Sequence, residues 1–201
     1  MSLDLFTCEG GTIMLPDKAS VLISREDGGN LVINPPREIW ERGELSPHEL
    51  TYWSFLIAAA GQAMLGTLPH LKGGCINYWE AGNWALNDEA EPRGEKKTAR
   101  EFRKVHLHLL GRNPLSTNPA TQWGESPKFP AFSDRLVWAE NYDRLTPDEC
   151  RSIVQRVEHL LVTKYGVKKN EISGWDVCSQ CQYPTTLEVN ARAILCRECR
   201  K

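Results

Sequence analysis

Two pairs of cysteines near the C-terminal end constrain the fold of this chain more than any other feature. The pairs are Cys178-Ser-Gln-Cys181 and Cys196-Arg-Glu-Cys199, separated by residues 182–195. Each CxxC pair forms a tight turn that directs two sulfurs at one point, so two pairs complete a tetrahedron around one metal ion. Four protein ligands leave no position open for water, so this spacing predicts a structural zinc site (Zn²⁺). Four free thiols in a frayed tail are the alternative.

The length and composition are typical of one ordinary domain with a small appendage. The chain has 201 residues, of which 41% are hydrophobic, enough for a substantial core. We place the main domain at residues 1–173 and a zinc-ribbon module at residues 174–201. The module is too short and polar to fold by burial alone, which favours stabilisation by a metal.

Charge and cysteine usage indicate a cytoplasmic protein. The net charge is −2 and the isoelectric point about 6.2, which argues against bulk nucleic-acid binding. Cys8, Cys75 and Cys150 bring the cysteines to an odd total of seven, which argues against a disulfide framework. We expect no signal peptide, since no basic segment precedes an apolar one. The longest apolar run, Phe55–Ala60, is too short to span a bilayer, so we expect no membrane contact.

The order of apolar runs and turns predicts an α+β fold. We expect strands at residues 21–24, 31–34, 75–78, 84–86 and 105–110, with a Gly28-Gly29 hairpin turn between the first two. Capping boxes at Ser46–Glu49 and Thr146–Glu149 predict the starts of two helices, each with apolar residues at helical spacing. Residues 111–144 read as a long loop, in which Trp123–Pro130 forms either a lid or a packed surface segment.

The segment Lys104-Val-His-Leu-His-Leu-Leu-Gly-Arg112 is the candidate for chemistry. In a strand, Val105 and its alternate neighbours face a core, while Lys104, His106 and His108 share the opposite face. Three cationic or potentially cationic groups on one open face favour an anion such as phosphate. Imidazole also serves as a nucleophile or a general acid near neutral pH.

This segment resembles the signature of the histidine triad family, His-φ-His-φ-His-φ-φ with φ apolar. The upstream stretches Gly29–Arg37 and Leu45–Leu50 are similar to that family's strand and helix start, so the resemblance covers roughly residues 15–112. It implies an antiparallel sheet with two main helices, and a hydrolase or transferase acting on nucleotides. By this resemblance His106 attacks phosphorus and becomes nucleotidylated, and His108 contacts phosphate oxygens. The sequence leaves a homodimer open.

Lys104 departs from the family pattern, since it stands where the first histidine is expected. Lysine supplies a point charge but cannot relay a proton as imidazole does, so the departure puts turnover in question. A rival register makes Leu110 the third position and His108 the nucleophile. We disfavour it because Leu109 and Leu110 then fall out of phase.

Three further residues are candidates for substrate binding. Arg112 follows Gly111, much as a Gly-Arg pair often follows the triad of that family. Asn87, with Gly94, matches an asparagine before a glycine-rich loop, although it equally suits the start of a turn. Asn34 either lines the pocket or ends its strand.

The resulting hypothesis is a nucleotide phosphoester, anhydride or phosphoramidate hydrolase, or a nucleotidyl transferase, with a nucleotidyl-histidine intermediate. The alternative is a catalytically weak nucleotide-binding adaptor whose zinc ribbon, with its basic end, docks a protein or nucleic-acid partner. Two further interpretations of His106 and His108 stay open: solvated residues on a polar sheet face, or a metal site that needs a third ligand.

Overall fold

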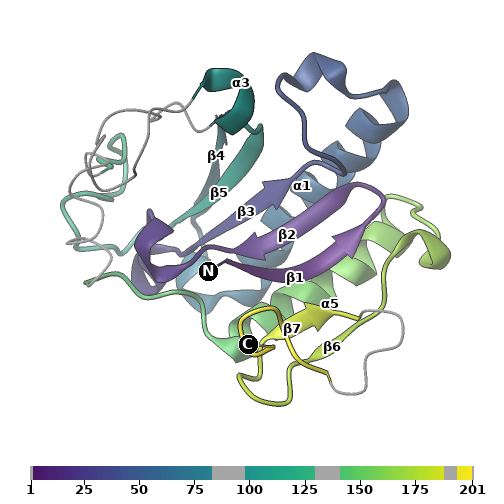
Figure 1. Cartoon of the computed structure of the whole chain (residues 1–201). Coiled ribbons are helices and arrows are strands. Elements are labelled where there is room, and N and C mark those ends of the chain that lie inside the picture. Colours follow the sequence, from purple (N-terminus) through teal and green to yellow (C-terminus); the bar gives the residue numbers. More distant parts are fainter. Residues whose placement is uncertain (1, 83–97, 130–140, 188–193, 201) are drawn as a thin grey trace.

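A five-stranded antiparallel sheet with two long helices behind it forms the body of the molecule (Figure 1). The computed structural model describes residues 2–82, 98–129, 141–187 and 194–200. The strand order is β1-β2-β3-β5-β4. The strands are β1 (Leu3–Cys8), β2 (Gly11–Leu15), β3 (Asn30–Asn34), β4 (Cys75–Ala81) and β5 (His106–Arg112). This architecture confirms the predicted α+β fold.

The two long helices begin where their capping boxes predict. They are α1 (Pro47–Thr67) and α5 (Pro147–Thr163). At α1 the Glu49 backbone N–H donates to Ser46 Oγ at 3.2 Å, and the Ser46 N–H donates to the Glu49 carboxylate at 2.8 Å. These reciprocal bonds satisfy donors that a helix start leaves unpaired. A short helix, α3 (Ala99–Phe102), lies before β5.

Short 3₁₀ turns connect several of these elements. They are η1 (Lys18–Ser20), η2 (Arg25–Asp27), η3 (Arg42–Glu44), η4 (Pro69–Leu71) and η6 (Lys169–Glu171).

The hydrophobic core lies between the sheet and the two helices. Trp53 of α1 and Leu109 of β5 are completely buried there, and Leu107 is nearly so. Gly61 of α1 meets the Tyr78 hydroxyl so closely that a Cβ at this position would overlap it. Leu107 and Leu109 of β5 face the core, and His106 and His108 face the other side of the sheet, on which Leu110 and Arg112 are buried as well.

The expected strand at residues 21–24 is wrong. This segment forms no ladder, and 3₁₀ helix η2 follows it. The Leu22 N–H donates to Asn30 Oδ1 at 3.1 Å, and the Gly29 N–H donates to the Ser24 carbonyl at 2.9 Å. Side-chain and turn hydrogen bonds thus satisfy the backbone groups that a ladder would have satisfied.

The antiparallel neighbour of β3 on this side is β2, which forms a hairpin with β1, and not residues 21–24. The alternation of β1 is interrupted by a register shift between Asp4 and Phe6, so Leu5 and Phe6 are both buried. The expected strand at residues 75–78 is present and extends to Ala81, whereas residues 84–86 lie outside the described residues.

A second, two-stranded sheet carries the C-terminal cysteines. Its strands are β6 (Trp175–Val177) and β7 (Pro184–Thr186), and it lies beside β1 and α5 (Figure 1). Thr186 Oγ1 is hydrogen-bonded to Thr7 Oγ1 of β1 at 3.1 Å. The module therefore covers the β1 edge of the main sheet. The boundary at residues 173 and 174 stays a prediction.

In the described parts of the chain, no helix combines the length and apolar character needed to cross a membrane.

Candidate histidine site and four-cysteine cluster

The two histidines of the candidate site lie on the open face of β5. That strand pairs with β3 on one side and with β4 on the other, so the site lies within the sheet and not at its edge. His106 and His108 are half-buried, while Val105, Leu107 and Leu109 are buried. This alternation confirms that the two imidazoles share a face opposite the core.

The hydrogen bonds of His106 fix which of its nitrogens is available. Its Nδ1 lies 2.8 Å from the carbonyl oxygen of Lys104. Because a carbonyl can only accept, Nδ1 carries the proton and donates it. In the neutral ring, Nε2 then holds the lone pair, which is the form that a nucleophile requires.

The second histidine completes a pair of facing nitrogens. His108 Nε2 lies 3.1 Å from His106 Nε2, with the rings at 67°. Since His106 Nε2 accepts, His108 Nε2–H is the donor in this contact. The Nδ1 of His108 is buried, with no hydrogen-bond partner among the described residues. The donor of His108 and the lone pair of His106 therefore point at each other.

Burial keeps both rings neutral. It lowers the pKa of His106, although the hydrogen bond to the Lys104 carbonyl opposes this. Burial, with a smaller contribution from neighbouring His106, lowers the pKa of His108 to about 3. Desolvation disfavours the charged form of imidazole, so the pair is uncharged at neutral pH.

Lys104 contributes to the site mainly through its backbone. It lies just before β5, and its Nζ is 2.5 Å from the Glu38 carboxylate at the protein surface. Its carbonyl, and not its ammonium group, contacts His106. Asn34 is the last residue of β3. Because Ile33 pairs with Leu107 in antiparallel register, the next pair along the two strands is Asn34 and His106.

Arg112 lies at the far end of β5 and is only 5% exposed. Its Nη2 donates to the carbonyl oxygens of Thr121 (3.3 Å), Gln122 (2.8 Å) and Glu125 (2.9 Å). The guanidinium group therefore organises the loop after β5. Its predicted role in substrate binding stays a prediction, as does that of Asn34. Asn87 lies outside the described residues.

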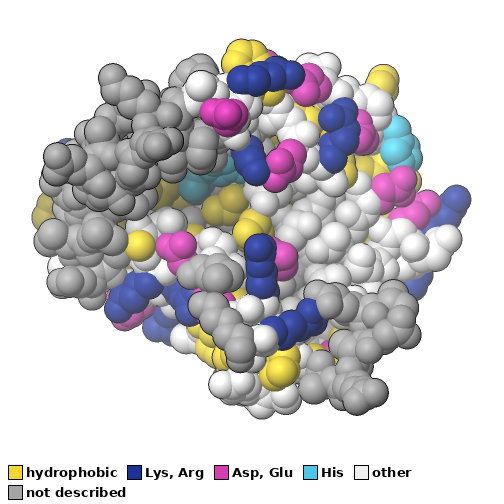
Figure 2. All heavy atoms as spheres, in the orientation of Figure 1, with side chains coloured by type: hydrophobic (Ala, Val, Ile, Leu, Met, Phe, Trp, Pro, Cys, Tyr) yellow, Lys and Arg dark blue, Asp and Glu magenta, His cyan; other side chains and the backbone are white. Residues whose placement is uncertain are grey.

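Two aromatic residues that the sequence did not indicate lie beside the histidines. Trp79 of β4 is the cross-strand partner of His108, and their rings are stacked with centroids 5.3 Å apart. Phe129 stacks on Trp79 at 5.1 Å and an angle of 9°. Trp79 lies one residue beyond the strand expected at residues 75–78, and no sequence signal gives its partner across the sheet. Figure 2 shows histidine and hydrophobic side chains together on the floor of a hollow.

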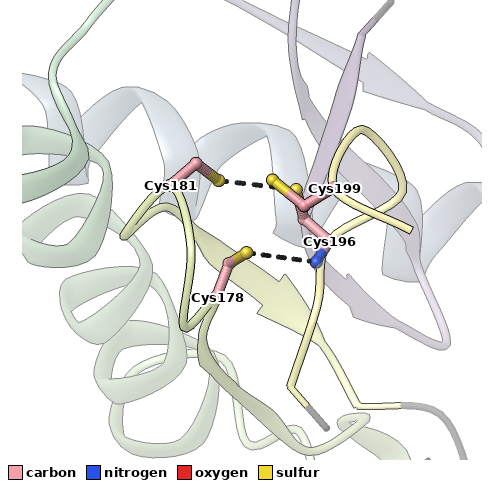
Figure 3. Close-up of side chains that lie close together, drawn as sticks. All are labelled: Cys178, Cys181, Cys196 and Cys199. Atoms are coloured by element: carbon pink, nitrogen blue, oxygen red, sulfur yellow. Dashed lines mark hydrogen bonds between the residues drawn. The ribbon is translucent and has the colours of Figure 1, made fainter. Parts of the chain in front are cut away.

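The four C-terminal cysteines converge as their spacing predicts (Figure 3). All four Sγ atoms lie within 4.8 Å of one another, and those of Cys181 and Cys196 are 3.4 Å apart. Thiolates bound tetrahedrally at about 2.3 Å from a metal lie about 3.8 Å apart, so these sulfurs need only small shifts to bind one. Four sulfur donors fit a structural metal such as zinc.

Backbone donors favour a thiolate at one of these positions. Burial by itself raises the pKa of Cys178, but backbone N–H groups of Cys181, Cys196 and Gln180 outweigh it and lower that pKa to about 6. The Cys196 N–H lies 3.3 Å from Cys178 Sγ. Among the described residues, these four cysteines are the only cluster of three or more metal-ligating side chains. A metal site at His106 and His108 therefore has no third protein ligand among those residues.

No protein-family model, curated protein or solved structure matches this chain.

Proposed function

We propose that this protein is a hydrolase or transferase acting on phosphate esters, anhydrides or phosphoramidates of nucleosides, with His106 as the nucleophile. The single observation that carries this proposal is the hydrogen bond from His106 Nδ1 to the Lys104 carbonyl. It leaves the Nε2 lone pair on the open face of the sheet, beside the Nε2–H donor of His108. The resemblance of residues 104–112 to the histidine triad signature supports the same assignment.

The proposed reaction has two steps. His106 Nε2 forms a bond to the phosphorus of the substrate, and the bond from phosphorus to the leaving group breaks with its electron pair. Water then attacks the phosphorus of the nucleotidyl-histidine, and the bond from phosphorus to Nε2 breaks with its electron pair, which restores the neutral imidazole. The nucleoside monophosphate leaves, and the proton lost by the water passes to solvent. In a transferase another acceptor replaces the water.

His108 is suited to stabilise charge on the phosphoryl group. Its Nε2–H contacts His106 at 3.1 Å, and a substrate phosphate that displaces this contact would receive the same N–H on one of its oxygens. Lys104 would add positive potential nearby, although its ammonium group is already paired with Glu38. Leaving groups that depart without a proton, such as a second phosphate, suit this arrangement best.

The four-cysteine cluster is proposed to bind zinc in a structural role. Four thiolates leave no coordination position open for water, so the metal would take no part in the chemistry of His106. It would instead hold together the turns beside β6 and β7, of which β7 contacts β1.

A nucleotide-binding adaptor without turnover is the second candidate. The observation that favours it is the ion pair of Lys104 with Glu38, at 2.5 Å, where the family pattern expects a histidine that moves protons. A protein or nucleic-acid partner would then bind the C-terminal module on the side that faces away from β1.

The test compares His106→Asn with His159→Asn, a matched change at an exposed residue of α5. The substrates are an adenosine phosphoramidate and a dinucleoside polyphosphate, and intact mass is measured with the rate. We expect His106→Asn to abolish turnover and the nucleotidyl adduct, because asparagine cannot form that intermediate, and His159→Asn to change neither.

The outcomes separate the two candidate functions. Undiminished turnover in His106→Asn would eliminate the proposed mechanism. Nucleotide binding with no turnover and no adduct in the native chain would favour the adaptor.

A further inference from the structure

Three aromatic rings form a row on the open face of the sheet, beginning at the candidate site. His108 stacks on Trp79 with centroids 5.3 Å apart and an angle of 25°, and Trp79 stacks on Phe129 at 5.1 Å and 9°. The rings come from β5, β4 and the loop after β5, so tertiary structure alone brings them together. The row starts at the ring whose Nε2 faces His106.

Trp79 leaves much of its surface uncovered. It is 44% exposed, although it lies on a sheet face within a row of other rings. Rings in van der Waals contact lie about 3.5 Å apart, so centroid separations above 5 Å mean that the neighbours are offset along the indole. Part of the indole surface therefore remains available to another planar ring. An uncovered aromatic surface offers a planar ligand ring a place to stack.

The loop that supplies Phe129 is held in place and does not simply lie over the sheet. The Lys128 N–H donates to the Ala120 carbonyl at 2.8 Å, next to Phe129. The buried guanidinium of Arg112 binds three carbonyl oxygens between residues 121 and 125. Since Arg112 belongs to the same strand as His108, the loop and the histidine are fixed to one element.

We infer that Trp79, backed by Phe129, binds the nucleobase of the substrate by stacking. This inference rests on the proposed function, because it assumes that a phosphate binds at His106 and His108. Neighbouring strands are about 4.8 Å apart, so Trp79 lies within the length of one nucleoside from that phosphate. Stacking needs only a planar ring, so Trp79 confers preference for an aromatic base over a bare sugar phosphate.

The test is isothermal titration calorimetry of the full chain with AMP, ribose 5-phosphate and phenyl phosphate. The variants are Trp79→Ala, Trp79→Phe and the control Trp123→Ala, which removes another exposed tryptophan, 43% exposed, from the same loop as Phe129. We expect Trp79→Ala to weaken AMP about tenfold, as for the loss of one base stack, and to leave ribose 5-phosphate unchanged. Trp79→Phe should retain most of the AMP affinity, and Trp123→Ala all of it.

Three results would overturn the inference and leave the proposed function standing. Equal losses for AMP and ribose 5-phosphate in Trp79→Ala would mean that Trp79 only positions His108. Unchanged AMP affinity would exclude stacking, and a loss confined to phenyl phosphate would assign the surface to a leaving group. If the native chain binds none of the three ligands, the proposed function itself fails and the inference falls with it.

Discussion

Replacement of Cys196 by serine should destabilise the whole protein and not only its C-terminal module. Cys196 is buried, and its N–H donates to Cys178 Sγ at 3.3 Å. Both residues belong to the same hydrophobic core as the main sheet and its two helices. Loss of one thiolate should release the metal, because the module gains its folding free energy from four ligands.

The contacts that join the module to the main domain set the size of the effect. Trp175 Nε1 donates to Glu158 Oε2 at 2.8 Å, and the Tyr183 hydroxyl donates to the Leu145 carbonyl at 3.0 Å. The hydroxyls of Thr186 and Thr7 form a third hydrogen bond. A neutral hydrogen bond contributes about 1 kcal/mol net and one to a charged acceptor about 1.5–3 kcal/mol. The total is about 4 kcal/mol.

That loss is a large fraction of the roughly 5–15 kcal/mol by which a domain is usually stable. For a domain of this size, each kcal/mol shifts the melting temperature by about 2–4 °C. Cys196→Ser should therefore lower the melting temperature by about 8–16 °C. The main domain should still unfold cooperatively, since it keeps its own core between the sheet and helices α1 and α5.

The assay is differential scanning calorimetry together with the zinc content of protein purified without chelator. Cys75→Ser is the control, because Cys75 is exposed on β4 and is not part of the cluster. One zinc per native chain and none in Cys196→Ser is the expected content. If Cys196→Ser loses zinc but has the same melting temperature as Cys75→Ser, the coupling of the module to the sheet is refuted. If Cys196→Ser keeps the zinc content of the native chain, the metal site is refuted.

Two further predictions concern the histidine pair and the backbone of β5. Because burial lowers the pKa values of His106 and His108, both rings stay neutral as pH falls through 6.5. We therefore expect kcat/KM to stay constant down to pH 6.5 and to decline only at lower pH. A decline in kcat/KM with its midpoint at or above pH 6.5 would contradict this. A Cβ at Gly111 would overlap the Gly28 carbonyl, so Gly111→Ala should cost about 1–3 kcal/mol in urea unfolding. The control Gly66→Ala adds a Cβ to α1 with nothing within 4 Å and should stabilise by about 0.5–1 kcal/mol; equal midpoints for the two variants would disprove the overlap.

The amino-acid sequence alone determined the features that depend on neighbouring residues. Both capping boxes form where their spacing predicts, since a side chain and a backbone N–H three residues apart meet within one helical turn. The two sulfurs of each CxxC pair are brought together by a local turn. The alternation around His106 likewise follows from the period of a strand.

The tertiary structure decided which residues surround those features. Trp79 faces His108 only because β4 pairs with β5 in one register, and a shift by one residue would turn Trp79 toward the helices. The β1–β2 hairpin was missed because a register shift in β1 breaks its alternation. Lys104 was selected for its charge, yet its carbonyl is the group that orients His106. A residue pattern specifies side chains along one strand, whereas cross-strand partners and backbone acceptors depend on how distant segments pack.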